Sequence, residues 1–146
     1  MTLLIVCSMM AMLSCKTAST QSELKKEVVI DSYCAWDGKP LPVYPQEAPR
    51  ITLLRITIPP HAKLDWHKHP IINVGYMTKG SLTVTSDDGS TKTINSRDGI
   101  IELVDQYHYG ENKSNKETEI IVFYVGTKES QLSEGRSSGV LLPKTQ

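Results

Sequence analysis

Residues 67–80 read HKHPIINVGYMTKG, and this stretch decides how the chain folds. His67 and His69 are separated by one residue, so on a strand their side chains point to the same face of the sheet. Residues 71–78 are rich in apolar and β-branched side chains and end at Lys79-Gly80, which is typical of a strand that stops at a turn. The stretch therefore predicts extended chain that presents two imidazoles on one side.

The sequence on either side of this stretch also has the features of strands. After residue 26, no run of a dozen residues repeats apolar positions at helical spacing. The four residues Asp87-Asp88-Gly89-Ser90 predict a hairpin turn between two β-rich runs. Short strands about ten residues apart indicate a β-sandwich or a small barrel. The expected strands are Val28–Tyr33, Ile51–Ile58, Ile71–Thr78, Ser81–Ser86, Thr91–Asn95, Ile100–Val104 and Thr118–Val125.

Composition limits the class of protein and its partners. The chain has 146 residues, with 16 Lys+Arg and 16 Asp+Glu, which fits one globular domain with its own core. Because the charges balance and form no basic block, we expect no nucleic-acid partner and no binding to an anionic membrane surface. The unusual feature is a group of four histidines within 48 residues, namely His61, His67, His69 and His108.

The first residues have the pattern of an export signal. Leu3–Ser14 is apolar and uncharged; it is shorter than the roughly 20 residues that a membrane-spanning helix needs but suits a signal peptide. It ends at Met12-Leu13-Ser14-Cys15, which resembles a bacterial lipobox with Cys15 as the lipidated residue. We expect residues 1–14 to be a signal peptide and residues 15–26 a flexible tether. The protein would then lie in the cell envelope, as a membrane-anchored lipoprotein or as a periplasmic or secreted protein; an N-terminal helix of the mature domain is the alternative.

The histidines indicate a metal site. Two imidazoles on one strand face can bind one ion, and a third ligand must then come from another strand. His108 is the only other histidine late in the chain. Imidazole suits Fe, Ni, Cu and Zn, and oxygen ligands extend the choice to Mn. The sequence therefore predicts a divalent transition metal on His67, His69 and His108, the alternative being a pair of surface or hydrogen-bonded histidines.

Two longer patterns resemble the metal-binding motifs of the cupin superfamily. In the first cupin motif, HxH is followed by Glu and then by Gly, and here the pattern is His67-x-His69-x3-Asn73-x6-Gly80. The second motif ends in His-x3-Asn, which residues 98–112 (DGIIELVDQYHYGEN) match. The resemblance implies an all-β, single-domain cupin fold, a double-stranded β-helix or jelly-roll barrel, with the metal inside it. We expect the barrel over residues 27–127 and a C-terminal tail over residues 128–146.

Some residues depart from the cupin motifs. Asn73 stands where the family has a glutamate ligand, and its amide oxygen would be a weaker, neutral donor. His61, Arg97 and Asp105 stand where the family has glycines, so we expect His61 to replace a turn glycine. Asn112 is expected to hold the turn after His108 through its side-chain amide.

Glu102 is the natural substitute for the missing glutamate. It lies in an otherwise apolar strand, where a carboxylate is costly to bury unless it is paired or bound to a metal. It would either complete a three-histidine, one-carboxylate ligand set or act as the catalytic general base. The alternative is that it faces outward. Trp66 and Tyr107 are expected to line the pocket.

The resemblance leaves the reaction open, because one fold supports many activities. We expect a metalloenzyme with dioxygenase-type or Lewis-acid chemistry on a small oxygenated compound. The first alternative is a non-catalytic envelope lipoprotein that binds a metal or small ligand, and the second is a barrel that holds no ion. Resemblance to small cupins also implies a homodimer.

Overall fold

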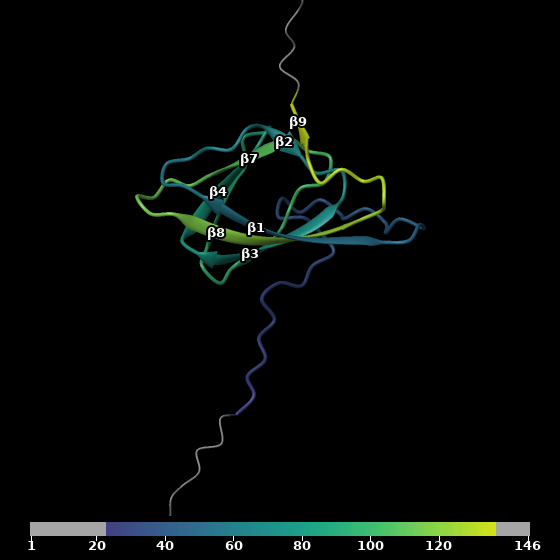
Figure 1. The fold of residues 1–146 in the computed structure, drawn as a ribbon, viewed down its shortest axis with the longest axis horizontal. Helices are drawn as coiled ribbons and strands as arrows, with labels where there is room; N and C mark the ends of the chain where they lie inside the picture. Colours follow the sequence, from purple (N-terminus) through teal and green to yellow (C-terminus); the bar gives the residue numbers. More distant parts are fainter. Residues whose placement is uncertain (1–22, 137–146) are drawn as a thin grey trace, which may run out of the picture.

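Two antiparallel sheets face each other and enclose the interior of the protein (Figure 1). This computed structural model describes residues 23–136. One sheet has the strand order β1-β8-β3-β6 and the other β5-β4-β7-β2-β9. The strands are β1 (Arg50–Ile58), β2 (His67–Lys68), β3 (Ile72–Lys79), β4 (Ser81–Ser86), β5 (Thr91–Asn95), β6 (Gly99–Ile101), β7 (His108–Glu111), β8 (Thr118–Gly126) and β9 (Glu134–Gly135). The all-β fold expected from the sequence is confirmed.

The core lies between the sheets because side chains alternate along each strand. In β8, alternate residues from Thr118 to Gly126 are buried, and those between them are more exposed. β3 alternates in the same way over most of its length, and β4 adds Leu82 and Val84 to the interior from the other sheet. Each fully buried aliphatic side chain contributes about 1.5–3 kcal/mol. The buried core consists of Ile58, Ile71, Met77, Leu82, Val84, Ile94, Ile100, Ile120, Val122 and Tyr124.

Most expected strands form where the sequence placed them. Ser81–Ser86 and Thr91–Asn95 coincide with β4 and β5, and the 87–90 turn joins them. The expected Val28–Tyr33 strand is wrong: these residues lie outside both sheets, and Figure 1 shows this part of the chain leaving the sandwich on the β3 side. Their apolar composition is typical of a strand, but these residues pair with no strand of either sheet. The strand expected to run to Val104 ends instead at Ile101.

The described part of the C-terminal segment packs onto the sandwich. Residues 128–136 lie within the expected tail, yet they contain β9, which pairs with β2. The guanidinium of Arg50 also donates hydrogen bonds to the carbonyls of Lys128 (3.0 Å) and Ser130 (2.6 Å). The signal peptide, Cys15 and most of the tether lie outside the described residues. Within residues 23–136, the structure has no helix that is long and apolar enough to span a bilayer.

Among residues 23–136, three non-glycine residues adopt left-handed backbone conformations. They are His61 (φ 58°), Arg97 (φ 79°) and Asp105 (φ 55°), the same three positions at which the cupin motifs have glycine. An L-residue in this region costs roughly 1–2 kcal/mol. The turn geometry of the motifs is therefore kept although their glycines are not.

Replacing Arg97 by glycine should stabilise the protein by about 1 kcal/mol, because glycine adopts this conformation without strain. The substitution also removes an ion pair with Glu27 (3.2 Å), but both side chains are largely exposed and the pair contributes little. Thermal unfolding of Arg97→Gly checks the prediction. Arg97→Ala is the matched control, because it removes the ion pair but keeps the strain. Equal melting temperatures for the two variants would contradict the prediction.

Candidate metal centre

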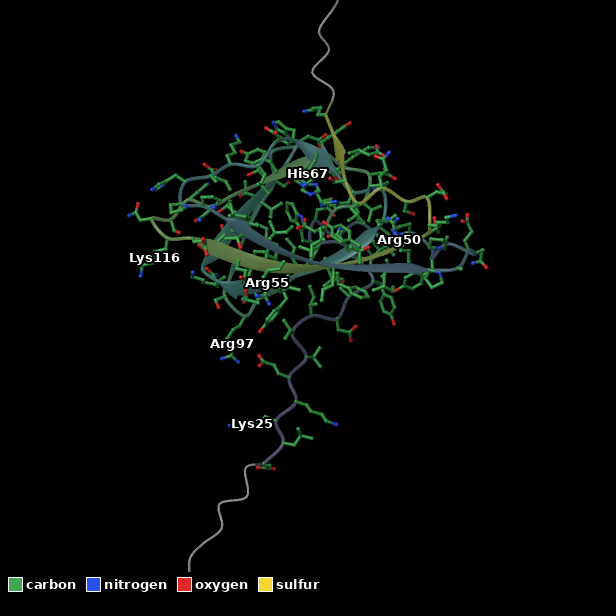
Figure 2. The ribbon with its side chains drawn as sticks, in the orientation of Figure 1. Lys25, Arg50, Arg55, His67, Arg97 and Lys116 are labelled. Carbon is green, nitrogen blue, oxygen red and sulfur yellow. The ribbon has the colours of Figure 1, made fainter. Side chains whose placement is uncertain are left out.

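The sheet topology brings three histidines together. β2 and β7 are antiparallel neighbours, with His67 opposite His108, and His69 lies two residues further along, in an isolated bridge with Val104. The ring centroids are 4.7 Å apart for His67 and His108 and 5.0 Å apart for each of the other two pairs. One ring nitrogen of each lies within 4.8 Å of the others. Figure 2 shows where β2 carries His67 in the sandwich.

Each imidazole is held through its Nδ1 atom by a backbone carbonyl. Because a carbonyl oxygen only accepts, each Nδ1 must carry the proton and donate it, which leaves the lone pair on Nε2. This arrangement is typical of metal-ligating histidines, whose second nitrogen is anchored in the same way. The acceptors are the carbonyls of Asp65 for His67 (2.7 Å), of Leu132 for His69 (2.7 Å) and of Gln106 for His108 (2.9 Å).

Burial keeps two of these imidazoles neutral. His69 and His108 are buried, and this burial lowers the pKa of each to about 4. Both rings are therefore unprotonated on Nε2 at neutral pH, so a metal would not compete with a proton there. Nε2 of His108 is moreover a buried nitrogen without a hydrogen-bond partner among the described residues. An unpaired buried polar atom is costly, and a metal ion would satisfy it.

Glu102 lies beside the three histidines and does not face outward. It follows β6, is 7 % exposed, and places Oε2 3.7 Å from Nε2 of His108. This oxygen has no hydrogen-bond partner among the described residues. Burial raises the pKa of Glu102 to about 7. Two donors on one tetrahedral ion with bonds near 2.1 Å lie about 3–4 Å apart, so the Glu102–His108 separation suits a shared metal.

Asn73 is completely buried on the interior face of β3. It is opposite Tyr124 of β8 in the ladder, and neither its amide oxygen nor its amide nitrogen has a hydrogen-bond partner among residues 23–136. Its backbone carbonyl accepts a hydrogen bond from the amide of Glu102 (3.2 Å). Asn73 therefore supports the segment that carries Glu102, and its role as a metal ligand stays a prediction.

An inner cavity of about 60 Å³ borders His67, His69 and Glu102, and an open groove of about 510 Å³ lies next to it. The two spaces share lining residues, including His67 and His69, and therefore adjoin at these histidines. Trp66 lines the groove. Tyr107 lines neither space; instead its ring lies 4.9 Å from the guanidinium of Arg136.

Two contributions to the site were not predicted from the sequence. The ring of Tyr124 lies 5.6 Å from that of His69 and lines the cavity, and burial raises its pKa to about 12, so its phenol keeps its proton. Leu132 lines the groove and supplies the carbonyl that holds His69. The alternating pattern of β8 could have revealed Tyr124 as an inward residue. A backbone carbonyl has no such sequence signal.

The fold and the site together define a β-sandwich protein with a three-histidine centre between its sheets. The family model of the Cupin domain matches residues 54–136. The chain belongs to the cupin family. A search of the curated proteins finds no match.

Solved structures support the same fold. The chain is similar to the polyketide cyclase RemF from Streptomyces resistomycificus, with a TM-score of 0.51 and 18% identity over 66% of this chain and 65% of the cyclase. It is also similar to the DMSP lyase DddQ from Ruegeria pomeroyi (TM-score 0.50, 12% identity, 57% of this chain and 42% of the lyase). A third is the oxalate decarboxylase from Lactobacillus farciminis (TM-score 0.50, 16% identity, 58% and 26%). This chain spans less than two thirds of each of these proteins, and the likeness concerns the fold alone.

Proposed function

We propose that this cupin binds a divalent transition metal (Fe, Mn, Ni, Cu or Zn) through His67, His69 and His108 and acts as a small-molecule metalloenzyme. The observation that carries the proposal is the common anchoring of the three rings. Each Nδ1–H donates to a carbonyl, so three Nε2 lone pairs are left for an ion. The donor set fits such a metal, because neutral imidazoles are preferred ligands of these ions.

A bound metal would supply Lewis-acid chemistry or, for a redox-active ion, dioxygenase-type chemistry on a small oxygenated compound. Residues of the chain near the metal would transfer protons and restrict the access of water. The carboxyl group of Glu102, with its pKa near 7, can hold or release a proton at Oε2. Apolar side chains such as Ile120 and Val122 restrict water in the inner cavity.

Turnover is tested by measuring oxygen uptake and product formation with catechols, flavonols and diketones. The tag-free protein is loaded separately with each of the five metals. The proposal expects turnover with at least one metal and none with the metal-free protein. Uniformly negative results with fully loaded protein would contradict an enzymatic role and favour a non-catalytic binding protein.

Glu102→Gln should weaken metal affinity by about tenfold or more, because it replaces an anionic donor beside His108 by a neutral amide. Calorimetric titration of the metal-free variant with Zn²⁺ measures the change. Glu111→Gln on β7 is the matched control, since Glu111 is not among the clustered ligands, and it should leave the affinity unchanged. Full metal affinity in Glu102→Gln would show that Glu102 is not a metal ligand and would leave it only a role in proton transfer or substrate binding.

We also propose that the mature protein is anchored in the cell envelope through a lipid on Cys15. The lipobox-like sequence that ends at Cys15 supports this. Incorporation of labelled palmitate in a bacterial host tests it, with Cys34→Ser as the control that should still be labelled. Labelling that persists in Cys15→Ser would contradict the proposal.

A further inference from the structure

The groove that leads to the histidines is mainly apolar and carries no positive charge. Among the described residues that line the groove or the inner cavity, two are acidic, Asp65 and Glu102, and none is lysine or arginine. The guanidinium of Arg136 lies 5.4 Å from the ring of Trp66, but Arg136 lines neither space. An anionic group in this groove would therefore lose its hydration without gaining a cationic partner.

The two spaces differ in size, so they select different parts of a ligand. The inner cavity, at about 60 Å³, has room for only a few water-sized groups. Its polar side chains are His67, His69, Glu102 and Tyr124. The outer groove, at about 510 Å³, can hold the body of a small molecule against Leu54 and neighbouring apolar side chains.

We propose that the site takes a small molecule with an apolar body and one small polar end, and that it rejects molecules whose body carries an anionic group. The polar end enters the inner cavity beside the histidines, and the body stays in the groove. This inference rests on the proposed function only for the reaction at the polar end of the ligand. The preference of the groove itself can be measured without a metal.

Three probes with the same hydroxyl end separate the alternatives: hexan-1-ol, 6-hydroxyhexanoate and 6-aminohexan-1-ol. Each is titrated into the metal-free protein, and the backbone amide shifts of Trp66 and Gly135, which line the groove, are followed by NMR. Hexan-1-ol should bind about tenfold more tightly than 6-hydroxyhexanoate, because the carboxylate of the latter would approach Asp65. The ammonium of 6-aminohexan-1-ol would approach the same carboxylate favourably, so this probe should also bind more tightly than 6-hydroxyhexanoate.

A charge-reversal variant tests whether Asp65 in the groove causes the preference for hexan-1-ol over 6-hydroxyhexanoate. Asp65→Lys should reduce the difference between hexan-1-ol and 6-hydroxyhexanoate to about threefold or less, since the acidic side chain becomes a cation. Asp65 is exposed, and His67 is held by its backbone carbonyl, so the fold and the histidine anchor should remain. Asp31→Lys is the matched control: it changes the net charge equally, at an exposed residue that does not line the groove, and it should keep the wild-type difference.

Three results would overturn the inference: binding of 6-hydroxyhexanoate at least as tight as that of hexan-1-ol, binding of the amino alcohol no tighter than that of 6-hydroxyhexanoate, or no binding of hexan-1-ol up to its solubility. A charge preference that Asp65→Lys leaves unchanged would also overturn it. If the preference is found but the protein binds no metal, the proposed metalloenzyme function fails while the inference about the groove stands.

Discussion

Replacing Asn112 by aspartate is expected to lower the free energy of unfolding by about 3–4 kcal/mol. Asn112 is fully buried, and the two N–H groups of its amide are shared among the carbonyls of Ile58 (3.1 Å), Pro59 (2.9 Å) and Lys116 (2.8 Å). Its amide oxygen accepts from the backbone amide (3.0 Å) and the hydroxyl (2.8 Å) of Ser114. Aspartate has the same shape but cannot donate when ionised, so three carbonyls would face a carboxylate oxygen.

Urea unfolding followed by circular dichroism measures this loss. Asn115→Ala is the control on the same loop, because Asn115 is exposed and accepts one hydrogen bond from His61 (2.8 Å). It should change stability by less than about 0.5 kcal/mol. A similarly small change for Asn112→Asp would show that the hydrogen bonds of Asn112 do not hold β1 to the loop after β7.

His108→Ala is expected to reduce metal affinity by more than about 100-fold, because it removes one of three imidazole donors from the ligand set. Zinc titration of the metal-free variant measures the loss. Since His108 is buried, its removal can also destabilise the core. His67→Ala provides a second test, because His67 is only partly buried and can be truncated with a smaller loss of packing.

His61→Gly is the matched control for both histidine variants. His61 is exposed, hydrogen-bonds to Asn115 and has a left-handed backbone, so glycine removes an imidazole without adding strain. The control should bind metal as the wild type does. Unchanged metal affinity in folded His67→Ala and His108→Ala would contradict the assignment of these residues as ligands.

The sequence allowed the larger strands to be predicted because alternation over five or more residues is a clear signal. β4 and β5 were predicted with the correct bounds, and β1 to within one residue. β2 and β9, with two residues each, and β7, with four, are too short to give a pattern. Val28–Tyr33 failed for the opposite reason: its composition suits a strand, but the segment joins neither sheet, so composition alone did not predict pairing.

The residues of the site could be predicted where side-chain type and spacing carried a signal. The HxH spacing and the cupin-like motifs placed His67, His69 and His108 in one group, which the structure brings together. Glu102 was a candidate ligand or general base because a lone carboxylate in an apolar run is costly to bury, and the alternative was that it faces outward. The carbonyl of Leu132 was not predictable, since it is 63 positions from His69 and any residue has the same backbone acceptor. Tyr107 was expected in the pocket but lies against Arg136.

The metal content of the wild-type protein, purified without a histidine tag and analysed by mass spectrometry, tests the central claim most directly. Three Nε2 atoms with fixed tautomers predict close to one divalent transition metal ion per chain. The same analysis would identify the metal and so narrow the chemistry. A protein that stays folded, contains no stoichiometric metal and takes up none when offered Fe, Mn, Ni, Cu or Zn would contradict the claim.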